Sequence, residues 1–463
     1  MPKLEFDHQL IERYDLAGPR YTSYPTAVQF TEDFGIADYR RQVELSNQPD
    51  GNKLARPLSL YFHLPFCDTI CFYCACNKIV TKNRKRAQPY LDSLYHEMAL
   101  QAELFDTTRK VDQLHWGGGT PTFINHDQMR ELMQKTRELF NLHDDDKAEY
   151  SIEIDPREAN TETVSLLREL GFNRISLGVQ DVDADVQKAV NRIQSIEETA
   201  EVIHAARDTG FHSVSVDLIY GLPLQTEAGF SQTLQTILEL NPDRLSIFNY
   251  AHLPDMFKTQ KQIKANELPT PKTKLAILEN CINTLTEAGY DYIGMDHFAK
   301  PDDELAMAQA SGTLYRNFQG YSTHANCDLL GLGVTSIGMV NDSYSQNQRG
   351  MDDYTKSLAN NQLPVFRGIT LSGDDKLRRV VITELICNFR LNKKAIEAEY
   401  QINFDDYFQA ALQQLLPMQD DTLVELGQGQ IIVTPKGSLF IRNICMAFDY
   451  YLKQSSNRFS RVL

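Results

Sequence analysis

Short apolar runs alternate with longer amphipathic stretches from about residue 57 of this 463-residue chain. The apolar runs predict strands at Leu58–Leu64, Gln113–Trp116, Tyr150–Ile154, Arg174–Val179, Ser213–Ile219 and Arg244–Tyr250. The stretches between them predict helices at Tyr90–Phe105, Gln128–Phe140, Thr161–Leu170, Glu197–Asp208 and Phe230–Leu240. Strands that alternate with helices of this length are typical of βα units around a parallel sheet. Six such units predict an α/β fold, an incomplete (βα)6 barrel, with its active site at the carboxyl edge of the strands.

The pattern changes after about residue 270. A helix is expected at Lys272–Ala288, and an apolar, glycine-rich stretch follows at Leu329–Val340. From about residue 369 the chain is mainly helical, with a hairpin (Leu423–Leu426 with Gln430–Val433) before a last helix, which is typical of a winged helix. Because no basic recognition helix accompanies the hairpin, packing over the barrel is expected rather than DNA binding. We predict three parts: an N-terminal arm covering the barrel (1–56), the barrel with its extension (57–368), and a helical, winged-helix-like C-terminal domain (369–463).

Composition narrows the classes of function. The 46 Lys and Arg against 62 Asp and Glu give a formal charge of −16 and a pI near 5.2. An acidic surface disfavours nonspecific nucleic-acid binding, which depends on cations that neutralise phosphates. The sequence shows no apolar run of the ~18–20 residues that a membrane span needs, and no apolar signal-peptide core at its start. We expect a soluble, cytoplasmic monomer without nucleic-acid or membrane partners.

The eight cysteines form two groups. Four are isolated and are expected to be small core residues: Cys281, Cys327, Cys387 and Cys445. The other four lie within ten residues: Cys67, Cys71, Cys74 and Cys76. Such crowding in a cytoplasmic chain indicates a metal site rather than disulfides. The C-x3-C-x2-C spacing of the first three suits a [4Fe–4S] cluster with one unligated iron. Zinc held by all four is the alternative, although zinc sites favour a distant second C-x2-C pair, which is absent.

Three further features indicate candidate ligand sites. The triple glycine Gly117–Gly119 follows the second expected strand; one glycine would serve a tight turn, so three favour a ligand against the backbone. Glu153 alternates with Ile152 and Ile154, so its side chain points either into the barrel or to solvent. Asp217 is a charge within an apolar strand and needs a polar partner, for which a salt bridge to Arg192 is one explanation.

Several motifs carry a resemblance to a known family. The C-x3-C-x-aromatic-C pattern of the cysteine loop resembles the radical S-adenosylmethionine superfamily. The runs Tyr61–Cys67 and Cys74–Ile79 resemble, more narrowly, the oxygen-independent coproporphyrinogen III oxidases (coproporphyrinogen dehydrogenases). The resemblance covers nearly the whole chain, through the further motifs Arg20–Thr26, His115–Thr122, Asn249–Pro254, Gly294–Phe298 and Arg442–Met446. Ala75 is a minor departure, because glycine is common there in the family.

The resemblance implies cofactors and the residues that hold them. It implies one [4Fe–4S] cluster per chain, held by Cys67, Cys71 and Cys74, together with one or two molecules of S-adenosylmethionine. The first of these molecules would lie against Tyr61, Tyr73, Gly118, Glu153 and Ile337. A second would lie against Gly119, Thr120, Gln180, Arg192, Asp217 and Ala251. Cys76 is not expected to be a cluster ligand, and its role is left open.

The resemblance also implies an oxidoreductase of porphyrin and haem biosynthesis. A 5′-deoxyadenosyl radical would remove hydrogen from two propionate side chains of coproporphyrinogen III, which would lose carbon dioxide and become the vinyl groups of protoporphyrinogen IX. An electron donor and an electron acceptor would be partners, and the sequence identifies neither. One alternative is a haem chaperone of the same superfamily, against which Cys76 argues; another is an iron–sulfur carrier or zinc-stabilised protein. The basic run Lys82–Arg86 is typical of a solvated face and could also attract an anionic substrate.

Overall fold

The protein is described by a computed structural model that covers residues 6–48 and 55–454. Its internal contacts divide the chain into two compact units. The barrel unit comprises Phe30–Lys274 and Asn326–Thr370, and the helical unit comprises Met1–Gln29, Leu275–Ala325 and Leu371–Leu463. The boundaries of these two units differ from those of the three parts expected from the sequence. The division into three parts therefore stays a prediction. Residues 1–5 and 49–54 of the expected arm, and 455–463 of the expected C-terminal domain, lie outside the described residues.

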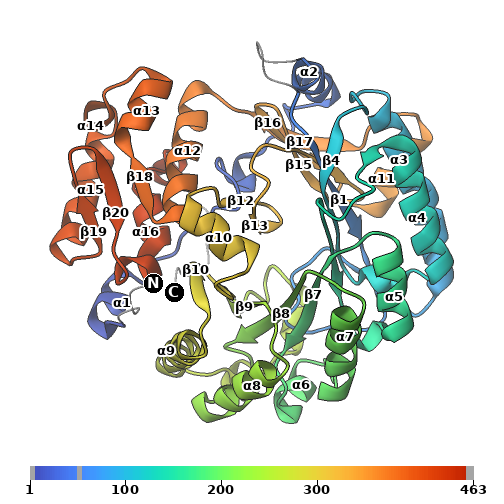
Figure 1. Ribbon diagram of the computed structural model, residues 1–463, viewed down its shortest axis with the longest axis horizontal. Helices are drawn as coiled ribbons and strands as arrows, with labels where there is room; N and C mark the ends of the chain where they lie inside the picture. The colour runs from blue at the N-terminus through green and yellow to red at the C-terminus, as the bar shows by residue number, and fades with distance from the viewer. Residues whose placement is uncertain (1–5, 49–54, 455–463) are drawn as a thin grey trace. The chain divides into compact units, whose positions relative to one another are not determined.

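Six parallel strands joined by helices form the centre of the barrel unit (Figure 1). The strands are β1 (Leu58–Leu64), β4 (Lys110–Gly118), β6 (Glu149–Ile154), β7 (Arg174–Gln180), β8 (Ser213–Tyr220) and β9 (Arg244–Asn249). The helices are α3 (Ala87–Ala102), α4 (His126–Leu139), α5 (Thr161–Glu169), α6 (Ala184–Ala189), α7 (Ile196–Asp208) and α8 (Glu227–Glu239). All five neighbouring strand pairs are parallel, in the order β9-β8-β7-β6-β4-β1. The expected (βα)6 barrel is therefore confirmed.

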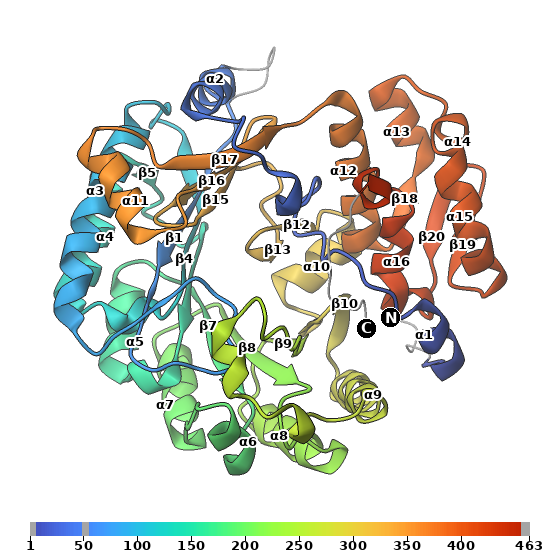
Figure 2. The same cartoon turned by 180° about the vertical axis from the view of Figure 1, so that it is seen from behind.

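The sheet continues beyond β1 through strands that were not predicted from the sequence. They are β14 (Asp328–Leu332), β15 (Ile337–Val340), β16 (Ser343–Asn347) and β17 (Val365–Thr370), with α11 (Met351–Ala359) between the last two (Figure 2). Strand β14 is parallel to β1, and the next three strands are antiparallel. Smaller elements of the unit are α2 (Ile36–Ser46), β2 (Phe66–Cys67), β3 (Ile79–Val80) and β5 (Asn141–Leu142).

The central strands have one apolar and one polar face. The apolar face is buried and includes Leu60, Leu114, Ile152, Leu177, Val216 and Leu245. The polar face includes Tyr61, His115 and Ser151, which pair in succession across β1, β4 and β6, and Ser176, Asp217 and Ser246 of β7, β8 and β9, of which Asp217 pairs with Ser246. Helices α3, α4, α5 and α7 lie on one side of these strands (Figure 1). A parallel sheet packed on both faces would be apolar throughout, so the polar face is suited to ligands rather than to a second core.

The helical unit contains the C-terminal elements and the N-terminal residues. Its helices are α1 (His8–Tyr14), most of α9 (Pro271–Glu287), α10 (Glu304–Ser311), α12 (Gly373–Asn388), α13 (Lys393–Tyr400), α14 (Phe404–Tyr407), α15 (Gln409–Asp420) and α16 (Ile441–Met446). Its strands are β10 (Asp291–Gly294), β11 (His297–Ala299), β12 (Tyr315–Asn317), β13 (Gly320–Ser322), β18 (Arg390–Asn392), β19 (Val424–Leu426) and β20 (Gln430–Val433).

The expected C-terminal hairpin is present as β19–β20, and β18 adds a third strand beside β20. The N-terminal residues are bound to this unit by polar contacts: Arg442 donates to the carbonyl of Pro19 (2.9 Å), and Tyr21 donates to Asp449 (2.9 Å). Arg20, in the same segment, forms an ion pair with Asp296 (2.5 Å). The winged-helix comparison stays a prediction.

Among the described residues, no helix is long and apolar enough to cross a membrane.

Candidate cluster and cofactor site

The clustered cysteines lie in the loop that follows β1. Cys67 ends β2, which pairs in parallel with β3, so the loop returns beside its own start. The middle of the loop is bound to the segment around the end of α6, because Phe72 N–H donates to the carbonyl of Val190 (3.0 Å) and Asn191 donates to the carbonyl of Ile70 (2.7 Å). Backbone atoms therefore hold the loop without using the thiols.

Cationic and hydroxyl groups surround the three thiols. The Sγ of Cys71 accepts hydrogen bonds from Arg192 (3.6 Å) and Arg157 (3.9 Å), and the Sγ of Cys67 accepts one from Thr120 (3.6 Å). Burial, with Cys74 and Cys71 nearby, raises the pKa of Cys67 to about 11. The hydrogen bond with Cys76, together with the charge of Lys78, lowers the pKa of Cys74 to about 6 despite burial.

This donor set fits an iron–sulfur cluster. Three thiolates on one cluster carry negative charge, which nearby cations stabilise. Arg157 and Arg192 lie against Cys71, and Lys78 Nζ donates to the carbonyl of Cys74 (3.0 Å). The buried Nε of Arg192 has no hydrogen-bond partner among the described residues, so this guanidinium retains a donor for a bound group.

Arg192 pairs with Asp155, which corrects the salt bridge to Asp217 that the sequence allowed. Its Nη1 lies 2.9 Å from Asp155 Oδ2, and Arg157 contacts the same carboxylate at 2.7 Å. Asp217 instead accepts hydrogen bonds from the hydroxyls of Ser176 (3.1 Å) and Ser246. Burial raises the pKa of Asp217 to about 6. Neither Asp155 nor Arg157 was predicted to have a role, although their place directly after a central strand was a signal.

The glycine turn and Glu153 meet at the carboxyl end of β4 and β6. Gly118 has φ +117°, and its N–H donates to Glu153 Oε2 (3.1 Å). A Cβ on Gly118 would lie 2.7 Å from the ring of His63, and one on Gly119 would lie 2.6 Å from the carbonyl oxygen of Phe66. The chain's own atoms therefore already require glycine at both positions. The expected contact with a cofactor stays a prediction.

Glu153 lies on the polar face beside Tyr61 and His115. Its Oε1 is 3.4 Å from His115 Nε2, and the rings of Tyr61 and His115 stack with centroids 5.8 Å apart. Burial acts to raise the pKa of Glu153, but the hydrogen bonds from His115 and Gly118 hold it below its ordinary value. Its side chain is nevertheless 47% exposed, so this carboxylate is ionised and accessible. Three residues expected around the first cofactor, Tyr61, Gly118 and Glu153, are thus close together.

The other expected cofactor residues lie in the cysteine loop or beside strand ends. Tyr73 and Ala251 are connected through Gln260, whose Nε2 donates to both carbonyl oxygens (3.0 and 3.2 Å). Gln180 ends β7 in a left-handed conformation (φ +72°), at a shift in sheet register. Ile337 begins β15, and its carbonyl would lie 2.7 Å from a Cβ on Gly331, the β14 neighbour of Tyr61. Gln260 was missed because no pattern in the sequence pairs it with the cysteine loop.

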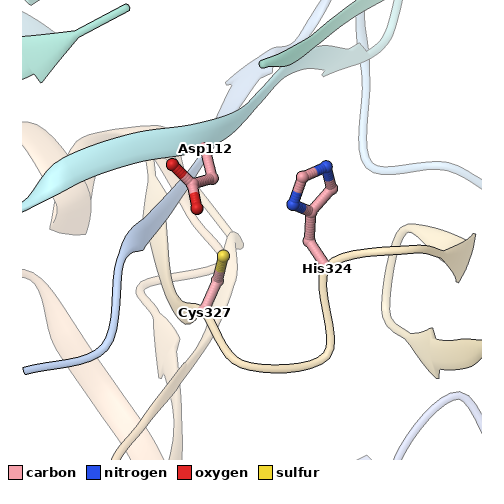
Figure 3. Close-up of side chains that lie close together, drawn as sticks. All are labelled: Asp112, His324 and Cys327. Atoms are coloured by element: carbon pink, nitrogen blue, oxygen red, sulfur yellow. The ribbon is translucent and has the colours of Figure 1, made fainter. Parts of the chain in front are cut away.

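The isolated cysteines are core residues, as predicted. Cys281, Cys327, Cys387 and Cys445 are all buried. Figure 3 shows Cys327 with Asp112 of β4, and their potential ligand atoms lie within 4.8 Å of each other. His324, also labelled there, belongs to the other compact unit. Burial, with Asp112 and Asp328 nearby, raises the pKa of Cys327 to about 12.

Comparison with known proteins identifies the family. The radical SAM superfamily model matches residues 61–237, and the HemN C-terminal domain model matches residues 371–440. The oxygen-independent coproporphyrinogen III oxidase of Pseudomonas aeruginosa is 52% identical over 461 residues, covering 99% of each chain. That of Escherichia coli K12 is 50% identical over 463 residues, covering 100% of this chain and 99% of its own. This chain belongs to the family of oxygen-independent coproporphyrinogen III oxidases.

A solved structure supports the same assignment. Coproporphyrinogen III oxidase (HemN) from Escherichia coli, a radical SAM enzyme, superposes with a TM-score of 0.91 at 49% identity, covering 97% of this chain and 100% of its own. Membership of the oxidase family confirms the resemblance and the radical SAM α/β fold, and it does not favour the haem-chaperone alternative. The superfamily range 61–237 includes the cysteine loop and every expected cofactor residue except Ala251 and Ile337.

Proposed function

We propose that this chain converts coproporphyrinogen III to protoporphyrinogen IX without oxygen, as the oxidative step of porphyrin biosynthesis. The observation that supports this most strongly is a three-thiol loop at the carboxyl edge of a polar-faced barrel, in a chain about half identical to oxygen-independent coproporphyrinogen III oxidases over their full length. Each of two propionate side chains loses one hydrogen atom, one carbon dioxide and one electron, and becomes a vinyl group. The electron passes to an external acceptor.

The cysteine loop holds the metal centre in this proposal. When bound, a [4Fe–4S] cluster with S-adenosylmethionine supplies the 5′-deoxyadenosyl radical that removes hydrogen. Cys67, Cys71 and Cys74 bind the irons as thiolates, and Arg157 and Arg192 stabilise the charge of Cys71.

The polar face of the sheet binds cofactor in this proposal. Glu153 is ionised and accessible, so it accepts hydrogen bonds from the first S-adenosylmethionine, beside Tyr61 and Gly118. Asp217 and Arg192 bind a second molecule. The hydroxyls of Ser176 and Ser246 orient the carboxyl group of Asp217 for this role. A cytoplasmic monomer remains part of the proposal.

The test is an anaerobic assay on protein with a reconstituted cluster. The protein receives dithionite, S-adenosylmethionine, an electron acceptor and coproporphyrinogen III, and products are separated by chromatography. Protoporphyrinogen IX, 5′-deoxyadenosine and methionine are expected from the wild type and not from Cys71→Ser. Cofactor cleavage without porphyrin product would contradict the substrate, and haem binding without turnover would instead support a carrier. No cleavage by an intact, reducible cluster would refute the enzyme.

A further inference from the structure

One strongly basic segment lies in this acidic chain. Between Asp68 and Asp92 there is no acidic residue, but there are five cations: Lys78, Lys82, Arg84, Lys85 and Arg86. The chain as a whole carries −16. In the structure Lys82, Lys85 and Arg86 are exposed, in the short segment that connects β3 to α3. A positively charged patch on an otherwise negatively charged protein attracts a partner that carries negative charge.

This segment begins directly beside the cysteine loop. Strand pairing places Val80 opposite Cys67, and Thr81 N–H donates to the carbonyl of Cys67 (2.9 Å). Lys82 is the next residue. Arg84 then forms an ion pair with Asp68 (2.6 Å), the neighbour of Cys67 in the chain. The exposed cations are therefore attached to the segment that holds one of the three thiols.

A surface depression of about 820 Å³ adjoins the basic segment. Arg84, Phe123 and Arg157 line it, with the Arg84 guanidinium 4.3 Å from the ring centroid of Phe123. Two acidic residues, Asp127 and Glu158, line it as well, and Glu158 forms an ion pair with Arg84 (2.5 Å), so the positive charge comes from the exposed cations beside it. Arg157 is also the residue that contacts Cys71 Sγ at 3.9 Å, so one side chain connects the depression to the metal centre.

We infer that the exposed cations Lys82, Lys85 and Arg86, with this depression, form the docking surface for a small acidic electron-carrier protein. The inference depends on the proposed function only in that the reaction needs an electron from outside. In the step, the reduced carrier loses one electron and the [4Fe–4S] cluster changes from the 2+ to the 1+ state. The basic segment attracts the acidic carrier, and Arg157 places the contact next to Cys71.

The test compares two double variants of the full-length protein with a reconstituted cluster. Lys82→Glu/Lys85→Glu reverses the basic segment. Lys110→Glu/Lys147→Glu is the matched control: it changes the net charge equally, but at the start of β4 and just before β6, the opposite edge of the sheet. The probe is a plant-type [2Fe–2S] ferredoxin, an acidic one-electron carrier. Its dissociation constant is measured in the oxidised state by calorimetry at low and high salt. Cluster reduction by the reduced probe is followed by electron paramagnetic resonance.

We expect the first variant to raise the dissociation constant at least about tenfold at low salt and to slow cluster reduction similarly. The control should change either quantity less than about twofold, and turnover driven by dithionite should be unaffected in both. Absence of ferredoxin binding by the wild type, or an equal loss in both variants, would overturn the inference. A raised KM for coproporphyrinogen III with unchanged ferredoxin binding would also overturn it, and would assign the segment to the substrate. Failure of dithionite-driven turnover in the wild type would refute the proposed function, while the binding measurement would still decide the docking surface.

Discussion

Glu97 of α3 is a fully buried carboxyl group with three neutral hydrogen-bond donors. It accepts from Gly333 N–H (2.7 Å), Asn347 Nδ2 (2.6 Å) and the Tyr354 hydroxyl (2.6 Å). These donors hold the β14–β15 turn, β16 and α11 against α3. Burial raises the pKa of Glu97 from 4.5 to about 7 in spite of the three donors. We predict that Glu97→Gln removes a pH dependence from the stability of the barrel unit.

The sign and size of this pH dependence follow from the raised pKa of Glu97. Because the pKa is higher in the folded state, the contribution of Glu97 to stability is fully present below pH 4.5 and is lost as the pH rises to about 7. At ~1.4 kcal/mol per pKa unit, the free energy of unfolding falls by roughly 3 kcal/mol over this window and is flat above it. The glutamine also leaves one donor unpaired, at a cost of about 1–3 kcal/mol. That cost is independent of pH, so the slope is the quantity to measure.

The chain contains a built-in probe for the measurement. Trp116 is the only tryptophan and is fully buried in β4, with its ring packed edge-on against Phe172 (centroids 4.8 Å apart). Urea unfolding followed by its fluorescence at pH 5, 6, 7 and 8 therefore reports on the barrel unit. The stability of the wild type relative to Glu97→Gln should fall by about 1.4 kcal/mol per pH unit from pH 5 to 7 and stay level at pH 8. Glu103→Gln, at the exposed end of the same helix, should retain the slope of the wild type. If the difference in free energy of unfolding between the wild type and Glu97→Gln is the same at every pH from 5 to 8, the three donors keep Glu97 ionised throughout. That result would refute the reasoning.

Three further predictions concern the cluster and cofactor site. Cys71→Ser should lose most of its iron after reconstitution, by elemental analysis, whereas Cys327→Ser, outside the loop, should retain it. Gly118→Ala adds a methyl group 2.7 Å from His63 at a φ of +117°, so it should lower stability by about 1–3 kcal/mol and weaken S-adenosylmethionine binding in a calorimetric titration; unchanged binding would contradict the role of Gly118. Because the pKa of Asp217 is raised to about 6, cofactor binding that needs its carboxylate should weaken as the pH falls through 6, and Asp217→Asn should bind weakly at every pH; a pH-independent wild type would count against this.

Local patterns were sufficient to predict the six βα units. The strand expected at Leu58–Leu64 coincides with β1, and the five other strands differ from expectation by a few residues at their ends. Alternation was the signal, because each strand has one apolar face against helices and one polar face. The same alternation placed Glu153 opposite Ile152 and Ile154, and only the pairing with β4 shows that this side is the one with Tyr61 and His115.

Contacts that are distant in sequence were not predictable from local patterns. Strand β14 joins β1 across more than 260 residues, and the apolar run that forms it could equally have been part of a helix. The partner of Arg192 was misassigned for the same reason. Arg192 lies in the segment between β7 and α7, and Asp217 lies within the next strand, β8, but the loop after β6 brings Asp155 within 2.9 Å of the guanidinium.

The surroundings of the thiols show why a motif alone describes only part of a metal site. The C-x3-C-x2-C spacing specifies the three sulfur atoms, because all three lie in one loop. Their charge environment comes from other loops: Thr120 follows β4, Arg157 follows β6, and Arg192 lies between β7 and α7. Successive βα loops meet at the carboxyl edge of the sheet, so each can contribute one group to the same centre. Ligand identity is therefore encoded locally, whereas the groups that set the charge around the ligands are assembled by the barrel.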